Sequence, residues 1–293
     1  MKKNTFIFSF FLQIIIMITS NEVFAQKAAY LIFEKGGKTS SYEKLLQEAQ
    51  KADIILFGEL HNNPICHWLQ LELTKDLYQT KKENLILGAE MFEADNQLVF
   101  NEFTKNYIKE SNFLKECKLW DNYATDYKPL VEFAKENKLS FVATNIPRRY
   151  AAMVSKDGLK ALDKLENEAK NYIAPLPITV DLTLSGYANM LQMMGGGSAK
   201  GETFIYAQAV KDATMAYFIN KNLTKGKTFL HYNGSYHSDD FQGIMWYLLK
   251  ANPNLKILTI SSTEQAQMQK IDDKNKDKGN FILVTPETMT KTY

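Results

Sequence analysis

The sequence predicts an α/β fold, with a mostly parallel central sheet flanked by helices and with a helical insertion or lid. Short runs of β-branched and apolar residues alternate with amphipathic helical segments, an order typical of a parallel sheet. Most of these runs are apolar at every position, as expected for central strands that helices cover on both faces. One long stretch interrupts the alternation and predicts the insertion.

The strand and helix patterns follow one another along the chain. Strands are predicted at 53–57, 85–89, 140–144, 228–232, 256–260 and 281–285, with a first hairpin or edge strand at 30–33. Helices are predicted at 64–81, 95–108, 128–137 and 239–250. Pro64 suits the first position of its helix, where no backbone N–H is needed. We expect these elements to form one domain over residues 26–293.

The stretch from about 153 to 222 has helical patterns and no clear strand. It is rich in methionine and tyrosine, and a glycine triplet at 195–197 interrupts it. We interpret it as a helical insertion or lid over the edge of the sheet, with a glycine turn inside it.

The first 25 residues have the pattern of a secretory signal peptide. Lys2 and Lys3 precede an apolar run at 6–19, which is too short to span a bilayer comfortably, and Val23 to Ala25 resemble a cleavage site. An uncleaved anchor is the alternative. No cysteine follows the apolar run, so we expect an exported protein, periplasmic or secreted, that is not a lipoprotein.

Charge and cysteine content narrow the choice of partners. The formal net charge of +2 falls to +1 when Lys2, Lys3 and Glu22 are removed with the signal peptide. A nearly neutral chain gives no electrostatic reason to expect nucleic acid. The two cysteines, Cys66 and Cys117, are expected to be separate buried thiols rather than a disulfide.

The four histidines fall into two clusters, each close to a predicted strand. His61 and His67 follow the strand at 53–57, and His231 and His237 lie in and after the strand at 228–232. His61 and His237 each end a G-x-x-H pattern, in which we expect the glycine to let the chain turn sharply off the strand. Because ligands bind at the carboxyl ends of parallel strands, the two imidazoles are expected to meet there.

Other polar side chains reach the same edge. Glu90 follows the strand at 85–89, and Asn145 and Arg148 follow the strand at 140–144. The resulting candidate set for a divalent metal is Glu59, His61, Glu90 and His237. The same four groups are also a candidate catalytic set for acid–base chemistry, with histidine as the titrating member.

An ordered set of motifs resembles the ChaN-like haem-binding uptake family of the Tiki/TraB/erythromycin-esterase superfamily. The matching segments, in family order, are 55–64 with His67 and Gln70, 88–92, 145–148, 207–208 with 212–216, and 234–237. Members often have two histidines where this chain has Cys66 and His67, and some are lipoproteins. The resemblance implies a surface-exposed or periplasmic protein of haem or iron uptake or storage, in which an α/β core and a helical part enclose non-covalent haem.

The resemblance also implies partners. The arrangement associated with the member that gives the family its name is a homodimer that holds two haems face to face, with tyrosine ligation of the iron. An outer-membrane haem receptor is the expected delivery partner.

Several residues have the chemistry that non-covalent haem needs. No C-x-x-C-H motif is present, so covalent c-type attachment is excluded by pattern. Tyrosine, histidine and methionine are known axial ligands, and arginine pairs with carboxylates such as the propionates. The candidate haem-binding residues are His67, Arg148, Arg149, Tyr150, Tyr187, Tyr206 and Met193.

Two alternatives to haem binding stay open at this point. In the wider superfamily, G-x-x-H histidines with a glutamate and an arginine are associated with metal-dependent hydrolysis. In that case Glu59 or Glu90 is the base that acts on a metal-activated water. Alternatively, the polar residues serve only folding. A Ser-His-Asp hydrolase and a nucleotide-binding protein are disfavoured, because the G-x-S-x-G, G-x-G-x-x-G and P-loop motifs are absent.

Overall fold

A computed structural model describes residues 27–194 and 198–293 of the chain. The predicted signal peptide and the glycine triplet at 195–197 lie outside these residues. In the described part, no helix is both long and apolar enough to cross a membrane.

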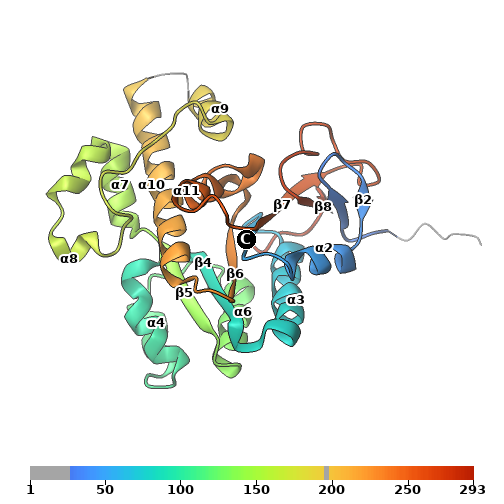
Figure 1. Ribbon diagram of the computed structural model, residues 1–293, viewed down its shortest axis with the longest axis horizontal. Coiled ribbons are helices and arrows are strands. Elements are labelled where there is room, and N and C mark those ends of the chain that lie inside the picture. The colour runs from blue at the N-terminus through green and yellow to red at the C-terminus, as the bar shows by residue number, and fades with distance from the viewer. Residues whose placement is uncertain (1–26, 195–197) are drawn as a thin grey trace, which may run out of the picture.

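An eight-stranded sheet runs through the middle of the molecule (Figure 1), in the order β2-β1-β8-β7-β3-β6-β4-β5. The strands from β8 to β5 pair in parallel, and β1 and β2 add an antiparallel edge. The strands are β1 Leu31–Glu34, β2 Thr39–Ser40, β3 Ile54–Glu59, β4 Leu85–Glu93, β5 Ser140–Asn145, β6 Thr228–Gly234, β7 Ile257–Gln265 and β8 Phe281–Pro286. The predicted α/β fold with a mostly parallel sheet is confirmed.

Helices cover both faces of this sheet. They are α2 Tyr42–Ala49, α3 Pro64–Lys81, α4 Gln97–Thr104, α5 Glu110–Glu116, α6 Lys128–Glu136, α7 Arg148–Asp157, α8 Asn167–Lys170, α9 Ser185–Met193, α10 Ala199–Asn222 and α11 Ile244–Ala251. A π-helical turn, Tyr123–Tyr127, precedes α6. Helix α3 begins where Asn63 accepts hydrogen bonds from the backbone N–H groups of Ile65 and Cys66, with Pro64 in its first turn.

The two faces have separate cores because strand side chains alternate between them. Ile55 and Phe57 of β3 pack with residues of α2 through α6, whereas Ile54 and Leu56 pack with α10 and α11. The C-terminal half of α10, including Met215, therefore belongs to the layer that covers the sheet. Its N-terminal half packs with α7 and α9, which lie to one side of the sheet in Figure 1.

The two cysteines are separate, free and buried, as expected. Burial raises the pKa of the Cys66 thiol to about 12, so it stays protonated.

Candidate functional site

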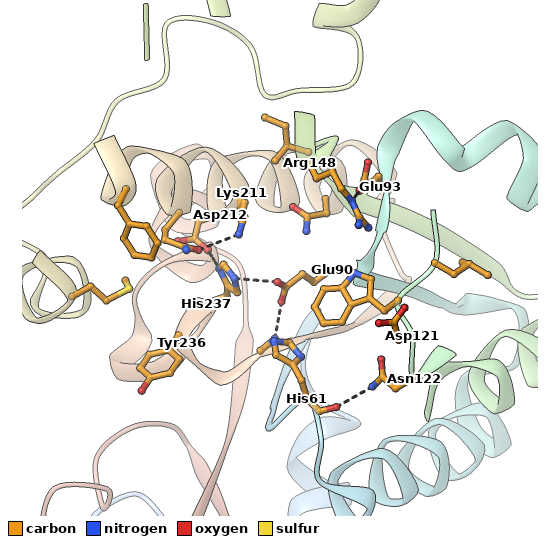
Figure 2. A pocket seen from close by; sticks show the side chains of 18 of the residues that line it. His61, Glu90, Glu93, Asp121, Asn122, Arg148, Lys211, Asp212, Tyr236 and His237 are labelled. Atoms are coloured by element: carbon orange, nitrogen blue, oxygen red, sulfur yellow. Dashed lines mark hydrogen bonds and ion pairs between the residues drawn. The ribbon is translucent and has the colours of Figure 1, made fainter. Parts of the chain in front are cut away.

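A cavity of about 900 Å³ opens at the carboxyl ends of β3, β4, β5 and β6. This is the position at which parallel sheets bind ligands. Its walls come from the two G-x-x-H turns, the β4 and β5 ends, the loop before the π-helical turn, α9 and α10 (Figure 2). The lining residues are His61, Glu90, Glu93, Leu119, Trp120, Asp121, Asn122, Asn145, Ile146, Arg148, Met190, Met193, Met194, Phe204, Gln208, Lys211, Asp212, Gly234, Tyr236, His237 and Tyr293.

The first G-x-x-H turn rests on a buried carboxylate. Glu59, the last residue of β3, accepts a hydrogen bond from His61 Nδ1 at 2.9 Å and one from the Tyr127 hydroxyl at 2.7 Å. Gln70 of α3 donates to its other oxygen at 2.6 Å. Because three donors compensate its burial, Glu59 can stay below the cavity floor and orient His61.

His67 lies in the layer below this turn. Its Nε2 donates to the His61 carbonyl at 3.0 Å and lies 3.4 Å from the Asp126 carboxylate. Its Nδ1 lies 3.6 Å from Glu59. His67 is buried and does not line the cavity, so it supports the first turn from behind.

The second G-x-x-H turn places its histidine between two carboxylates. His237 Nδ1 donates to Asp212 of α10 at 2.5 Å, and its Nε2 lies 3.2 Å from Glu90 of β4. Asp212 also accepts a hydrogen bond from the Tyr187 hydroxyl at 2.6 Å. Burial acts to lower the pKa of His237, but the charges of Glu90 and Asp212 outweigh it and raise that pKa to about 10. His237 is therefore an imidazolium at neutral pH.

Glu90 joins the two turns. The Gly234 backbone N–H donates to Glu90 at 2.8 Å. Burial opposes its charge, yet the neighbouring His237 charge keeps the pKa of Glu90 well below its usual value. His61 is also affected: burial lowers its pKa, but the hydrogen bond with Glu59 and the charge of Glu90 produce a net rise.

The four residues of the predicted divalent-metal set lie close together, but their side chains pair with one another and do not converge on one point. Glu59, His61, Glu90 and His237 form carboxylate–imidazole pairs. In residues 27–194 and 198–293, no group of three or more His, Cys, Asp or Glu side chains is arranged to hold a metal ion. The physical reason is that both His237 nitrogens and His61 Nδ1 already face carboxylates. The geometry of the described residues therefore gives no support to a divalent metal at these four residues.

The two glycines differ from their predicted role. Gly58 of β3 is in register with Asn233 of β6, and Gly234 of β6 is in register with Glu59 of β3. Neither glycine has a positive φ. A Cβ at Gly234 would lie 2.7 Å from His61 Nε2, and one at Gly58 would lie 2.9 Å from the Ile260 carbonyl. Close packing, rather than a sharp turn, requires glycine at both positions.

The candidate haem residues separate into two groups. Met193 and Arg148 line the cavity, where Arg148 pairs with Glu93. The others do not line it. Tyr187 is buried against Asp212. Tyr206 of α10 packs against the apolar cluster that includes Val154 of α7, and its hydroxyl lies 3.5 Å from Glu202.

Arg149 and Tyr150 point elsewhere. Arg149 pairs with Asp95, and its guanidinium lies 4.4 Å from the centre of the Tyr150 ring. Of the other histidines, His231 is fully buried inside β6, where burial lowers its pKa to about 4 and keeps it neutral. None of these three residues lines the cavity.

Among the cavity residues that sequence reasoning missed, four have side chains suited to contact a ligand. Tyr236 is 74% exposed at the cavity, and Lys211 has no carboxylate partner within the described ranges 27–194 and 198–293. Trp120 packs edge-on against His61, and Tyr293 lies far from the other motifs in the sequence. Only Tyr236 carried a usable signal, since it precedes the histidine inside the second G-x-x-H pattern.

Comparison with known proteins gives one family. The model described as "Haem-binding uptake, Tiki superfamily, ChaN" matches residues 45–248, which is more than half of the chain. No curated protein matches the sequence.

Solved structures are similar to this chain to different degrees. ChaN of Campylobacter jejuni, in a structure titled for cofacial haem binding, has a TM-score of 0.66 and 19% identity, with 87% of this chain and 96% of that chain covered. A Bacillus cereus protein has a TM-score of 0.46 and 12% identity over 76% of this chain and 69% of its own. The erythromycin esterase EreC has the same TM-score and identity over 84% of this chain and 78% of its own.

Proposed function

This chain belongs to the ChaN family of haem-binding uptake proteins, and from that premise we propose that it binds haem non-covalently in the cavity at the strand ends. The observation that carries the proposal is the composition of the cavity. It combines apolar walls, cationic side chains and an exposed tyrosine in a space of about 900 Å³, within the size range of cofactor sites.

The apolar part of the cavity suits the face of a porphyrin. Leu119 and Trp120 contribute from the loop before the π-helical turn, Ile146 from the end of β5, and Met190 and Phe204 from α9 and α10. These side chains come from both the α/β core and the helical segment at 153–222. Haem would therefore be held between the core and the insertion, as the fold prediction expects.

Tyr236 is the candidate axial ligand. Its side chain is exposed at the cavity, and its hydroxyl makes no hydrogen bond within the described part of the chain. Tyrosinate is an established ligand of ferric haem. Bound haem supplies a Lewis-acidic iron centre, and the role of this chain is to bind and orient it. The predicted candidates Tyr150, Tyr187, Tyr206 and His67 are less favoured, because the cavity is not lined by them.

Lys211 and Arg148 are the candidate propionate partners. Both line the cavity. Lys211 lies 3.5 Å from the neutral Gln208 side chain and has no carboxylate partner among residues 27–194 and 198–293. Arg148 pairs with Glu93 but keeps about half of its side chain exposed. A lysine and an arginine together can neutralise two carboxylates. Arg149 is less favoured, since it pairs with Asp95 outside the cavity.

The biological setting is part of the proposal. The signal-peptide pattern at 1–25 supports export to the periplasm or beyond, and the family description supports a role in haem or iron uptake. Exposed Met193, Met194 and Tyr236 at the cavity support a homodimer in which two copies cover this opening. An outer-membrane haem receptor is the proposed source of the ligand.

The test is a titration of the purified protein with hemin, followed in the Soret region. We expect a saturable, shifted Soret band, and Tyr236→Phe is expected to change its position and to weaken binding at least tenfold. Tyr107→Phe is the matched control, because Tyr107 is 75% exposed and lies outside the cavity. A wild-type spectrum that matches hemin mixed with an unrelated protein would refute haem binding.

A further inference from the structure

The segment at 287–293, which follows β8, is attached to the first G-x-x-H turn. The Thr292 backbone N–H donates to the Asn62 carbonyl at 3.0 Å, and its hydroxyl donates to Asp126 at 2.9 Å. Lys291 pairs with Glu264 of β7. In Figure 1 this end of the chain is drawn over the middle of the molecule, near β6 and α3. We call residues 287–293 the strap.

The strap brings Tyr293 to the cavity wall. Tyr293 lines the cavity, and 65% of the residue is exposed, so its aromatic ring has contact area left for a ligand. Asp126, which anchors Thr292, accepts a second hydrogen bond from Asn122 of the cavity wall. The position of Tyr293 is therefore set by the same polar network that supports His61.

Tyr293 and Tyr236 belong to different walls. Tyr236 is part of the second G-x-x-H turn, whereas Tyr293 is fastened to the first turn and to the Asn122–Asp126 region. In Figure 2, Asp121 and Asn122 lie across His61 and Glu90 from Tyr236. Burial and the negative charges of Glu59, Asp126 and Asp121 raise the pKa of Tyr293. They disfavour the tyrosinate form that iron ligation needs, whereas a packing contact does not need it.

We propose that Tyr293 is a second ligand-contacting tyrosine of the cavity, placed there by the strap, and that its ring packs against the bound haem without ligating the iron. The inference rests on the proposed haem binding. It concerns a part of the chain beyond the family match, which ends at residue 248. Thr292 is the positioning residue, because it touches the first turn and holds Tyr293 in place.

The experiment measures hemin affinity and the Soret maximum in parallel, with the quenching of tryptophan fluorescence as a second readout of occupancy; Trp120 is the tryptophan that lines the cavity. Tyr293→Ala is expected to weaken hemin binding about tenfold, the size typical of a well-packed aromatic contact. Its Soret maximum is expected to match the wild type, because the axial ligand is intact. Tyr293→Phe, which keeps the ring, is expected to stay within about twofold of wild-type affinity.

The positioning role has its own variants. Thr292→Val removes the hydroxyl donor at the same size and is expected to weaken binding by about threefold, since one hydrogen bond is lost, whereas Thr292→Ser restores it. Tyr107→Ala is the control for loss of an exposed tyrosine. Wild-type affinity in Tyr293→Ala, or a shifted Soret maximum in that variant, would overturn the assignment. Failure of the wild-type protein to bind hemin would instead refute the proposed function itself. The two failures are distinguishable, because the first is seen only in the variants and the second is already seen in the wild type.

Discussion

The two G-x-x-H turns have the same local pattern and reach the same cavity, yet their histidines have different environments. The His61 side chain is 33% exposed and uses Nδ1 for a carboxylate on its own strand. The His237 side chain is 10% exposed and has a carboxylate at each ring nitrogen, one from α10 and one from β4. Both histidines line the cavity, but the first is the more exposed of the two, whereas the second is a largely buried cation that connects three elements.

This difference shows that the role of each histidine comes from the elements that pack against it. The second turn lies against α10, which supplies Asp212, and Tyr187 of α9 holds that carboxylate in place. The first turn lies against α3 and the π-helical turn, which supply donors to Glu59. Variants in these supporting residues should therefore separate stability from ligand binding.

The largest effect is expected from Asp212→Ala. This variant leaves the His237 imidazolium with Glu90 as its remaining carboxylate and removes the acceptor of the Tyr187 hydroxyl. Breaking a buried ion pair from one side costs about 3–5 kcal/mol, and we expect the lower end because Glu90 remains. Urea unfolding measures the free energy of unfolding. Asp273→Ala, at an exposed ion pair, is the control and should change it by less than about 0.5 kcal/mol; equal losses would contradict the comparison.

The two glycines provide a second contrast. A Cβ at Gly58 would lie 2.9 Å from two backbone atoms, of Ile260 and Ser235, which cannot move without shifting strands. A Cβ at Gly234 would instead meet the His61 ring, a side chain that can rotate into the cavity. We expect Gly58→Ala to lower the free energy of unfolding by about 1–3 kcal/mol and Gly234→Ala by less. Gly234→Ala should still weaken hemin binding. If Gly234→Ala lost more free energy of unfolding than Gly58→Ala, the first turn would be the one that accommodates an added Cβ more easily.

A more gradual effect is expected from pH. The folded-state pKa of His237 is raised to about 10, above the ordinary value of about 6.5. Its contribution to stability is therefore fully present below about pH 6.5 and is lost as pH rises through about 10. The difference in free energy of unfolding between wild type and His237→Gln should shrink over that range. A difference that is constant from pH 6.5 to 10 would show that His237 is neutral in the folded protein.

Local sequence patterns were sufficient for the sheet and for most of its helices. The strand at 85–89 begins at Leu85 as predicted, and α3 has the predicted bounds 64–81, because apolar runs and Pro64 are local signals. The strands continue further than predicted, to Glu59 and Gly234, since parallel pairing extends strands beyond their apolar runs. The predicted family is confirmed by the match over residues 45–248.

The site was only partly predictable. Strand-end placement brought Glu59, His61, Glu90 and His237 together, as expected. The role of Asp212 could not be deduced, because α10 joins this edge only through long-range packing. The role of Tyr293 could not be deduced either, because its position depends on hydrogen bonds from Thr292 to residues more than a hundred positions away in the sequence. The predicted metal set has no support in the geometry of the described residues, and residue types alone do not reveal which nitrogen atoms already have partners.

A small change in stability is expected from His61→Gln, and this variant gives the sharpest test of the comparison. Glu59 keeps two donors, Tyr127 and Gln70, when His61 is replaced, so the loss of one hydrogen bond should cost about 1 kcal/mol. Because His61 lines the cavity, hemin affinity should nevertheless fall by several-fold. His237→Gln is the matched variant, with a larger loss in urea unfolding, since it removes a buried cation between two carboxylates. If both variants lost stability and hemin affinity in the same proportion, the two turns would form one structural unit, and the distinction between a ligand-facing and a structural histidine would be wrong.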